Sequence, residues 1–417
     1  MLVIIAADTN NGAPRKSGVS PVQQLILNPR AERRLKLGHL WIYSNEVDTQ
    51  RSPLKGLAPG SQCEILDSKE NSLGYALVNP NQLICARLVS RKGPFTRKQL
   101  HRRLENALAL RQRYFPHPSY RMVYGDSDGL PGLVVDRFGD YLVVQISSWG
   151  MENLLPDIVD GLVALVNPKG ILLRNDHQGR KVEELPEVCE VVHGEVPKMA
   201  PFEENGVALL APVFEGQKTG WFYDHRENRA RLNQWVKGQR VLDLFSYAGG
   251  WGVQALANGA KEVTCVDASG QALDWCEENA ALHNRKDDLI TIQGKAIDAM
   301  KELINAGERY DAIVLDPPAF IKRRKDQKSG EAAYRHINEL ALRLLEKNGL
   351  LVSASCSMHL ESDRLLEILR GAGRHLDKSI NIIGSGGQGA DHPIHPAIPE
   401  TRYLKAHFVH LSAGGNV

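Results

Sequence analysis

Two short segments in the C-terminal half of the chain carry side chains that could hold and attack a nucleobase. The first is Asp316-Pro317-Pro318-Ala319-Phe320, which follows the apolar run 312–315. Two prolines stiffen such a turn, a carboxylate can grip the polar edge of a base, and a phenylalanine can stack on its face. The pattern suits reaction at a ring carbon or at an exocyclic nitrogen, and by itself it does not choose between them.

The second segment is Ser355-Cys356-Ser357, which follows the apolar run 350–354. A thiolate that adds to C6 of a cytosine turns C5 into a nucleophile able to attack an alkyl donor. The alternative is that Cys356 is a small core residue, because free cysteines are often buried. Its position at the end of the next long apolar strand, 40 residues on when counted from 316 to 356, favours a covalent nucleophile.

The elements that must position these segments alternate from about residue 206 onward. The apolar runs VLDLFSY, KEVTCVDAS, YDAIVLDPP and GLLVSASCS are separated by stretches long enough for helices. This alternation predicts an α/β fold with a Rossmann-like, doubly wound parallel sheet. Such sheets bind ligands at the carboxyl ends of their strands, which is where Asp316 and Cys356 fall.

A glycine-rich turn after the first of these strands predicts a nucleotide-like cofactor. The segment Val241–Gly252 places an apolar strand before Ala-Gly-Gly-Trp-Gly, which differs from the G-x-G-x-x-G of dinucleotide enzymes. The next strand ends in Asp267, whose carboxylate can accept both hydroxyls of a ribose. Together they fit any adenosine-bearing cofactor, and the alternative for Asp267 is a helix N-cap.

Changes in composition divide the chain into four parts. Residues 1–20 are rich in small polar residues and predict a flexible tail, and residues 21–95 hold short apolar runs between turn signals and predict a small β domain. Residues 96–200 predict an α+β module with a basic helix over 96–115, two strands joined by a Phe-Gly-Asp turn, and an apolar helix near 153–166. Residues 201–417 form the Rossmann-like domain.

Overall composition excludes several classes of protein. The content of 42% apolar and 24% charged residues is that of an ordered globular chain. The six cysteines form no CxxC pair, which argues against a disulfide framework and a thiolate metal site and favours a reducing cytoplasm. We expect no membrane span, because no run of 18 or more apolar residues occurs.

Two basic stretches suggest contact with a polyanion. Between Arg87 and Arg121 there are ten Arg or Lys against one acid, Glu105. Lys322-Arg323-Arg324-Lys325 follows the Asp-Pro-Pro turn, where it could meet the phosphates beside a bound base. For both stretches the alternative is a solvated charged face, balanced in the first case by acids elsewhere in the fold.

Five motifs together carry a specific resemblance. They are Gly125–Gly132, Gln217–Arg226, Asp243–Gly250, Asp316–Phe320 and Ser355–Ser357. With them, the chain after residue 20 resembles the class I S-adenosylmethionine-dependent methyltransferases, closest to the family that methylates cytosine C5 in large-subunit ribosomal RNA and carries an N-terminal PUA domain. The resemblance implies S-adenosylmethionine as cofactor and RNA, in particular 23S ribosomal RNA or a large-subunit precursor, as partner. A homodimer stays open.

The resemblance also implies roles for individual residues. Cys356 and Asp316 would be catalytic, and Pro317, Pro318, Phe320, Lys322 and Arg323 would bind substrate. The residues near the cofactor would be Thr219, Phe222, Asp224, Phe245, Ser246, Gly249, Asp267 and Ala268. No metal is implied. The family's Asp391-His392-Pro393 pattern is present as well, with a structural role favoured for the histidine.

One departure from the family keeps two other functions open. The third Rossmann strand is usually followed by an acid that meets the adenine amine, whereas this chain reads Gln293-Gly-Lys295-Ala. A protein with a vestigial cofactor site would be an RNA-binding assembly factor. An exocyclic-amine methyltransferase, acting on adenine N6 or guanine N2, would use Asp316 and Phe320 while Cys356 only packs.

Overall fold

The N-terminal part of the chain folds as a small β domain. The computed structural model describes residues 22–413, so the predicted tail lies outside the described residues. A five-stranded sheet in the order β1-β3-β4-β5-β2 encloses aliphatic side chains and two buried cysteines. Its elements are β1 (Gln23–Ile26), α1 (Glu32–Lys36), β2 (Trp41–Tyr43), β3 (Gln62–Leu66), β4 (Ser72–Val78) and β5 (Ile84–Ser90).

A second five-stranded sheet, in the order β10-β9-β8-β7-β6, forms the central module. Helix α2 begins after Thr96, which exchanges capping hydrogen bonds with Gln99, and its buried face packs against α4 and β6. The predicted helices and the Phe-Gly-Asp hairpin are confirmed. The elements are α2 (Arg97–Tyr114), β6 (Ser119–Tyr124), β7 (Leu133–Phe138), β8 (Tyr141–Ile146), α3 (Trp149–Glu152), α4 (Leu155–Val166), β9 (Gly170–Asn175), α5 (Gln178–Val182) and β10 (Val188–Gly194).

A two-stranded sheet, β11 (Met199–Glu204) and β12 (Val207–Pro212), leads into the Rossmann-like domain. There a seven-stranded sheet has the order β15-β14-β13-β16-β17-β19-β18, with β19 antiparallel to its neighbours. The elements are α6 (Arg226–Asn233), β13 (Arg240–Leu244), α7 (Gly252–Ala257), β14 (Glu262–Asp267), α8 (Gly270–Ala281), β15 (Leu289–Gln293), α9 (Ala296–Asn305), β16 (Tyr310–Leu315), α10 (Gln327–Leu344), β17 (Leu345–Ser355), α11 (Ser362–His375), β18 (Ile380–Gly386) and β19 (Lys405–Leu411).

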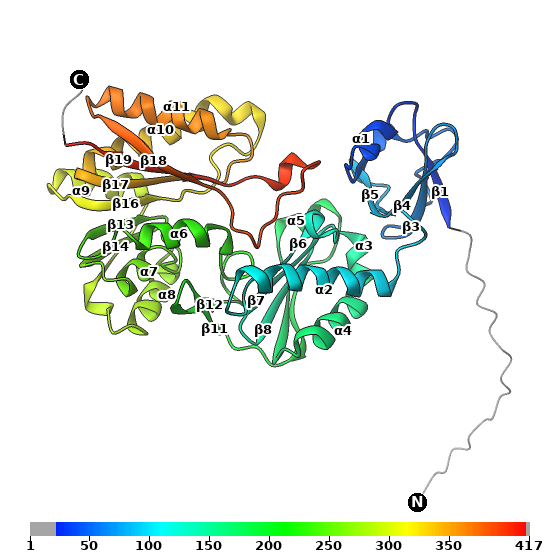
Figure 1. The fold of residues 1–417 in the computed structure, drawn as a ribbon, viewed down its shortest axis with the longest axis horizontal. Coiled ribbons are helices and arrows are strands. Elements are labelled where there is room, and N and C mark those ends of the chain that lie inside the picture. The colour runs from blue at the N-terminus through cyan, green and yellow to red at the C-terminus, as the bar shows by residue number, and fades with distance from the viewer. Residues whose placement is uncertain (1–21, 414–417) are drawn as a thin grey trace, which may run out of the picture.

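This sheet is doubly wound, as the alternation of strands and helices predicts. Apolar residues of α6, α7 and α8 pack on one face, and those of α9, α10 and α11 pack on the other (Figure 1). The strand order reverses between β13 and β16, which are hydrogen-bonded neighbours. A crevice for ligands is therefore expected at the carboxyl ends of these two strands.

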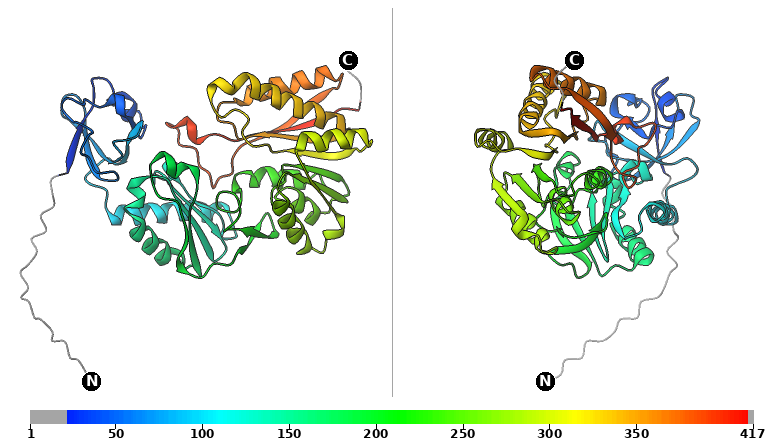
Figure 2. Two further views of the ribbon diagram at one scale, coloured as in Figure 1. Left: turned by 180° about the vertical axis from the view of Figure 1, so that it is seen from behind. Right: turned by 60° about the vertical axis from the view of Figure 1, so that its left-hand side comes forward.

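The connection between β18 and β19 ties the Rossmann-like domain to the central module. It leaves the seven-stranded sheet and reaches towards the central module, and the N-terminal domain lies at one end of the molecule (Figures 1 and 2). Arg111 of α2 donates to the carbonyl of Asp391 at 2.8 Å, and the hydroxyl of Tyr124 donates to the carbonyl of Thr401 at 3.3 Å. The N-terminal domain in turn contacts the central module through Arg87 and Glu183, 3.0 Å apart.

Most cations of the predicted basic stretch 87–121 are bonded to other groups within the protein. Six of its ten cations bind carboxylates or backbone carbonyls within the protein, namely Arg87, Arg91, Arg97, Arg103, Arg111 and Arg121. The remaining cations, Lys92, Lys98, Arg102 and Arg113, are exposed. Acids elsewhere in the fold therefore balance four of the ten charges, those of Arg87, Arg97, Arg111 and Arg121, and the four exposed cations keep the prediction of polyanion contact open.

Candidate active site

The turn after β13 is built from residues with left-handed backbone. Phe245 has φ 65°, Tyr247 has φ 48° and Gly249 has φ 82°. The amides of Phe245 and Ser246 both donate to the carbonyl of Val266, which joins the turn to the end of β14. A Cβ at Gly249 would lie 2.5 Å from Val253, so a side chain does not fit there. This turn is held in a conformation that most residues avoid.

Asp267 at the end of β14 holds the same turn from the other side. Its carboxylate accepts from the backbone of Tyr247 at 3.0 Å and of Ser269 at 2.9 Å. The N-cap of α8 is Ser269, whose hydroxyl accepts from Ala272, so Asp267 does not have the alternative role of N-cap. Ala268 is exposed beside it, and Lys295, where the family has an acid, is exposed at the start of α9.

Residues 218–226, which the resemblance places over the cofactor, contact both the central module and the turn after β13. Thr219 is fully buried and its hydroxyl donates to Asp136 of the central module at 2.5 Å. Phe222 packs edge-on against Tyr247, with ring centroids 5.4 Å apart, and Lys218 lies over its ring. The side chain of Phe222 thus reaches the cofactor turn, whereas that of Thr219 is directed into the core.

Asp224 in the same segment is buried but keeps one free acceptor. Its Oδ2 accepts from the hydroxyl of Tyr403 at 2.5 Å, and its Oδ1 has no hydrogen-bond partner among residues 22–413. Burial opposes its charge, but His225 and Lys218 together hold the pKa of this carboxyl well below its usual range. A charged oxygen with an unused lone pair can accept a hydrogen bond from a ligand.

Asp316 and Cys356 lie side by side, as their positions at strand ends predict. Leu315, which precedes Asp316, pairs in register with Ser353 of β17. The sulfur of Cys356 lies 3.9 Å from the carbonyl oxygen of Pro317. The two predicted catalytic side chains therefore share one edge of the sheet, next to the turn that follows β13.

Asp316 lies against two ring nitrogens that sequence reasoning did not single out, one as a hydrogen-bond donor and one at ion-pair distance. Its Oδ1 lies 3.1 Å from Nε2 of His225, and its Oδ2 accepts from the indole N–H of Trp251 at 3.1 Å. Burial opposes ionisation, but His225 and Trp251 outweigh it, and the pKa of Asp316 lies below its usual value. His225 is in the Gln217–Arg226 motif and Trp251 directly follows the Asp243–Gly250 motif, and this placement was the only signal.

The loop that carries Cys356 is clamped by buried groups. The hydroxyl of Tyr334 bonds to Ser355 at 2.8 Å and to Ser357 at 2.9 Å, and Lys405 donates to the carbonyl of Ser357 at 2.5 Å. Burial lowers the pKa of Lys405 to about 8. Burial, followed by the negative charge of Asp316, raises the pKa of the Cys356 thiol. Tyr334 and Lys405 also escaped sequence reasoning, because they come from α10 and β19.

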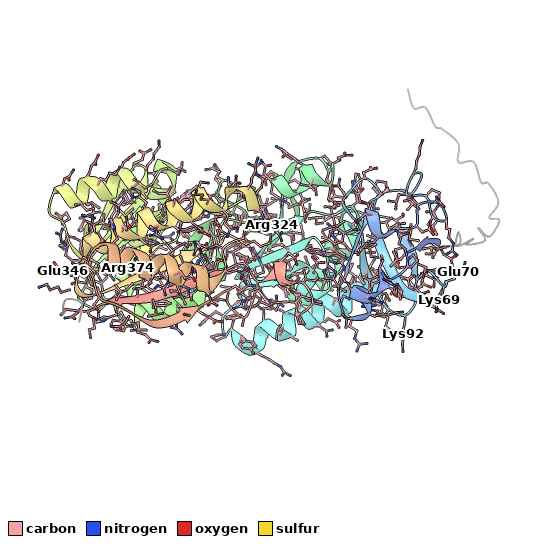
Figure 3. All side chains as sticks on the ribbon, turned by 90° about the horizontal axis from the view of Figure 1, so that it is seen from above. Lys69, Glu70, Lys92, Arg324, Glu346 and Arg374 are labelled. Atoms are coloured by element: carbon pink, nitrogen blue, oxygen red, sulfur yellow. The ribbon has the colours of Figure 1, made fainter. Side chains whose placement is uncertain are left out.

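The predicted substrate-binding residues divide into packed and exposed ones. Pro317 is buried and Pro318 is exposed, while the ring of Phe320 packs on Tyr334 at 4.8 Å and is half-buried. Lys322 and Arg323 are exposed, with Arg323 also 3.3 Å from Asp326. Figure 3 shows the neighbouring Arg324 on the outer surface, near the middle of the molecule.

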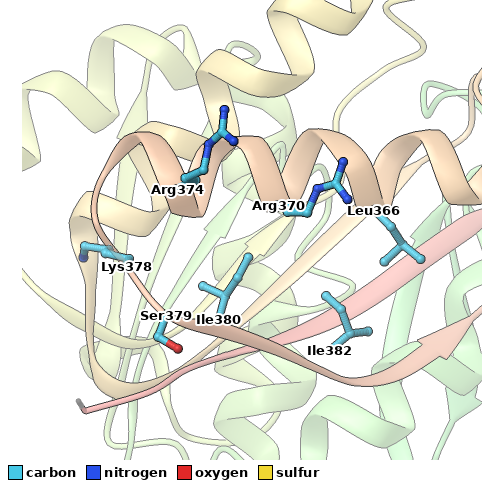
Figure 4. Close-up of a pocket in the computed structure, with 7 residues that line it drawn as sticks. All are labelled: Leu366, Arg370, Arg374, Lys378, Ser379, Ile380 and Ile382. Carbon is cyan, nitrogen blue, oxygen red and sulfur yellow. The ribbon is translucent and has the colours of Figure 1, made fainter. Parts of the chain in front are cut away.

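A separate pocket lies away from this site. It is formed between α11 and β18, and Figure 4 shows the residues that line it: Leu366, Arg370, Arg374, Lys378, Ser379, Ile380 and Ile382. None of the predicted site residues lines it.

Within residues 22–413 there is no group of three or more His, Cys, Asp or Glu side chains that could hold a metal ion. In the same range, no helix has the length and apolar character that crossing a bilayer requires.

Comparison with known proteins adds two domain assignments. Residues 25–91 match a PUA-like domain, and residues 168–376 match the S-adenosylmethionine-dependent methyltransferases. Solved structures with the same fold include a protein from Streptococcus mutans that is described as a candidate S-adenosylmethionine-dependent methyltransferase, at a TM-score of 0.77 and 19% identity, covering 93% of this chain and 100% of that one. SMU.776 complexed with SAH has a TM-score of 0.78 at 20% identity, with the same coverage.

Sequence relatives are similar over almost the whole chain. The ribosomal RNA large subunit methyltransferase I of Erwinia tasmaniensis is 34% identical over 400 residues, which covers 92% of this chain and 98% of that protein. The protein of the same name from Shewanella frigidimarina is 33% identical over 391 residues, with 92% and 98% covered. The similarity therefore extends through the PUA-like, central and Rossmann-like parts.

Proposed function

Because the chain belongs to the ribosomal RNA large subunit methyltransferase I family, we propose that it methylates C5 of a cytosine in large-subunit ribosomal RNA, 23S in bacteria. It is an S-adenosylmethionine-dependent methyltransferase with a PUA-like domain. The observation that carries the C5 assignment is the pairing of a held carboxylate, Asp316, with the half-buried thiol of Cys356 at adjacent strand ends. The cytoplasm is the compartment in which such a substrate is available.

The described residues fit the cofactor. The turn from Phe245 to Gly249 has no room for a side chain at Gly249, Asp267 keeps a partly exposed carboxylate beside it, and Asp224 offers an unused buried acceptor. We propose that the cofactor contacts are made by Phe222, Asp224, Phe245, Ser246, Gly249, Asp267 and Ala268. Thr219 would act through its backbone, because its hydroxyl is bound to Asp136. S-adenosylmethionine supplies an electrophilic methyl group on a sulfonium.

Cys356 and Asp316 perform complementary tasks in this proposal. The thiolate of Cys356 adds to C6 of the cytosine, a bond that makes C5 nucleophilic enough to take the methyl group. Asp316 accepts from the polar edge of the base and holds it, with Pro317, Pro318 and Phe320 shaping the turn. Transfer of the C5 proton to a water molecule then allows the C6–S bond to break, and Cys356 leaves as a thiolate.

RNA contact would come from two regions. The PUA-like domain supplies one surface, and the exposed cations Lys322 and Arg323, next to the base-holding turn, supply phosphate contacts beside a flipped nucleotide. The PUA-like domain lies at one end of the molecule in Figure 1, so an RNA that contacts both regions must extend over more than one domain.

Nucleoside mass spectrometry on RNA from cells with and without this gene tests the proposal. The gene-deleted cells should lack 5-methylcytidine at one large-subunit site, and wild type should restore it. Cys356→Ala should not restore it, whereas Cys189→Ala should, because Cys189 is an exposed cysteine on β10, in the central module.

Two outcomes would replace the C5 proposal. Loss of a methylated adenine or guanine, restored by Cys356→Ala, would establish exocyclic-amine methylation, which a held carboxylate such as Asp316 also suits. Failure of the purified protein to bind S-adenosylmethionine in calorimetry would favour an assembly factor with a vestigial cofactor site, the reading that Lys295 keeps open.

A further inference from the structure

His225 is a buried imidazole with a polar group 3.1 Å from each ring nitrogen, and the approach of Nε2 to Asp316 has the distance of an ion pair without the alignment of a hydrogen bond. It ends the short turn η3 (Tyr223–His225) and is 2% exposed. Its Nδ1 lies 3.1 Å from Nδ2 of Asn228, and its Nε2 lies 3.1 Å from Oδ1 of Asp316. It is therefore the bridge between the base of α6 and the carboxylate at the end of β16.

Asn228 decides which ring nitrogen carries the proton. Its Nδ2 also donates to the carbonyl of Gly387 at 2.9 Å, which fixes the amide group with its N–H donors towards both partners. An amide NH2 donates and does not accept, so Nδ1 of His225 must be the acceptor. A ring N–H is then carried by Nε2, the nitrogen that lies 3.1 Å from Oδ1 of Asp316.

The second carboxylate oxygen of Asp316, Oδ2, can also only accept a hydrogen bond from its neighbour. Its partner is the indole N–H of Trp251, which can only donate. Two N–H groups close to one carboxyl group stabilise its ionised form, and neither of these two ring nitrogens offers an acceptor to a protonated Asp316. The side chain of Asp316 is 23% exposed, so the lone pairs that remain on it can accept a hydrogen bond from a donor on the substrate.

We propose that His225, with its tautomer set by Asn228, is a positioning residue that keeps Asp316 an ionised acceptor for the exocyclic amine of the target base. This inference rests on the proposed function. Cytosine presents an N4 amine at that position, whereas uracil presents an oxygen that would face the carboxylate without a proton between them. The His225–Asp316 pair therefore selects cytosine over uracil.

Other charged groups surround Asp316 and must be counted in any pH measurement. Asp224 lies in η3 beside His225, Asp243 lies at the end of β13, and Cys356 follows β17. Burial raises the pKa of Asp243 to about 8. These groups are present in wild type and in the variants below. A difference between their pH profiles of kcat/KM therefore reports on the removed imidazole.

The first test is the pH profile of kcat/KM for His225→Leu and His225→Gln. Without the imidazole, burial is opposed by Trp251 alone, so the pKa of Asp316 rises and activity is lost at a higher pH on the acid side. Glutamine can place an N–H near the former Nε2 and should return the acid limb towards wild type. His407→Leu removes a buried imidazole of β19 that bonds to Ser362 and Ser385, and should leave the profile unchanged.

The second test uses substrate RNA in which the mapped cytidine is replaced by 2-pyrimidinone ribonucleoside, which lacks the amine. Loss of one hydrogen bond to a charged group lowers kcat/KM by roughly tenfold to a hundredfold, and we expect this penalty for wild type. For His225→Leu the penalty should nearly vanish, because the carboxylate is no longer held for the amine. Calorimetric binding of S-adenosylmethionine verifies that each variant is folded.

The outcomes separate this inference from the proposed function. If wild type forms 5-methylcytidine but the amine penalty is the same in His225→Leu, the positioning role is refuted and the C5 assignment stands. If the acid limb of the pH profile is the same in His225→Leu as in wild type, the positioning role is likewise refuted and the C5 assignment stands. If wild type forms no 5-methylcytidine at all, the proposed function fails and this inference fails with it.

Discussion

Asp136 links the central module to the segment over the cofactor site, which makes it a sensitive point for perturbation. It lies in β7 with no exposed surface, and accepts from Arg121 at 2.9 and 2.7 Å and from the hydroxyl of Thr219 at 2.5 Å. Replacement by alanine removes all three bonds. We expect Asp136→Ala to loosen residues 218–226 although the substitution is in another module.

The size of the expected effect follows from the burial of the Arg121–Asp136 ion pair. Arg121 would be left buried without a carboxylate, and breaking such a pair costs roughly 3–5 kcal/mol. Thr219→Val removes only the hydroxyl bond, which contributes about 1 kcal/mol. The larger value corresponds to faster hydrogen exchange of the affected amides by roughly a hundredfold or more, and the smaller to about fivefold.

Hydrogen exchange measured by mass spectrometry is the appropriate assay, because a chain of several domains need not unfold in one step. Peptides covering 218–226 should exchange faster in Asp136→Ala, and S-adenosylmethionine should bind more weakly in calorimetry. Asp140→Ala is the matched control, since Asp140 is in the same hairpin but forms an exposed pair with Lys169. Unchanged exchange of 218–226 in Asp136→Ala would refute the claim that Thr219 carries this coupling.

Three further predictions concern the thiol, the cofactor turn and the N-terminal domain. Because burial and Asp316 raise the pKa of Cys356, its alkylation by iodoacetamide should increase as pH rises into the alkaline range, and Asp316→Asn should move that curve to lower pH; a curve that does not move would contradict the electrostatic argument. Gly252→Ala should abolish S-adenosylmethionine binding in calorimetry, because the new Cβ would lie 2.7 Å from the sulfur of Cys265; binding at wild-type strength would show that the turn can yield. Glu183→Gln should weaken RNA binding in a filter assay without changing S-adenosylmethionine affinity, because Glu183 joins the N-terminal domain to the central module; equal RNA affinity would show that this ion pair does not orient the domain.

The strand-end residues could be predicted from the sequence because the geometry of a parallel sheet is general. Asp316 and Cys356 each follow an apolar run, and all parallel strands end at one edge. The position of β13 beside β16 then places the turn at Phe245–Gly249 next to them. For these residues local pattern and fold class were sufficient.

Residues whose partners lie in another module could not be predicted in this way. The resemblance placed Thr219 near the cofactor, but the partner of its hydroxyl is 83 positions away, from 136 to 219, in a different sheet. Arg111 and Arg121 counted as cations for nucleic acid, whereas both are buried and paired with Asp128 and Asp136. A sequence shows that a residue is charged, but it does not show whether the side chain is buried. Burial decides whether the charge can contact nucleic acid.

Asp391 shows why the Rossmann-like domain is not an independent unit. Its carboxylate accepts from the backbone of Arg121 in the central module at 3.1 Å, lies 3.5 Å from Arg226 at the start of α6, and lies 2.9 Å from Nδ1 of His392. Burial opposes its charge, but His392 and Arg226 keep the pKa of Asp391 below its usual value. A fragment that begins after β10 would lose Arg121 and expose a carboxylate that the whole chain keeps fully buried. The central module therefore completes the core beneath the cofactor segment, which gives it a role that composition alone did not reveal.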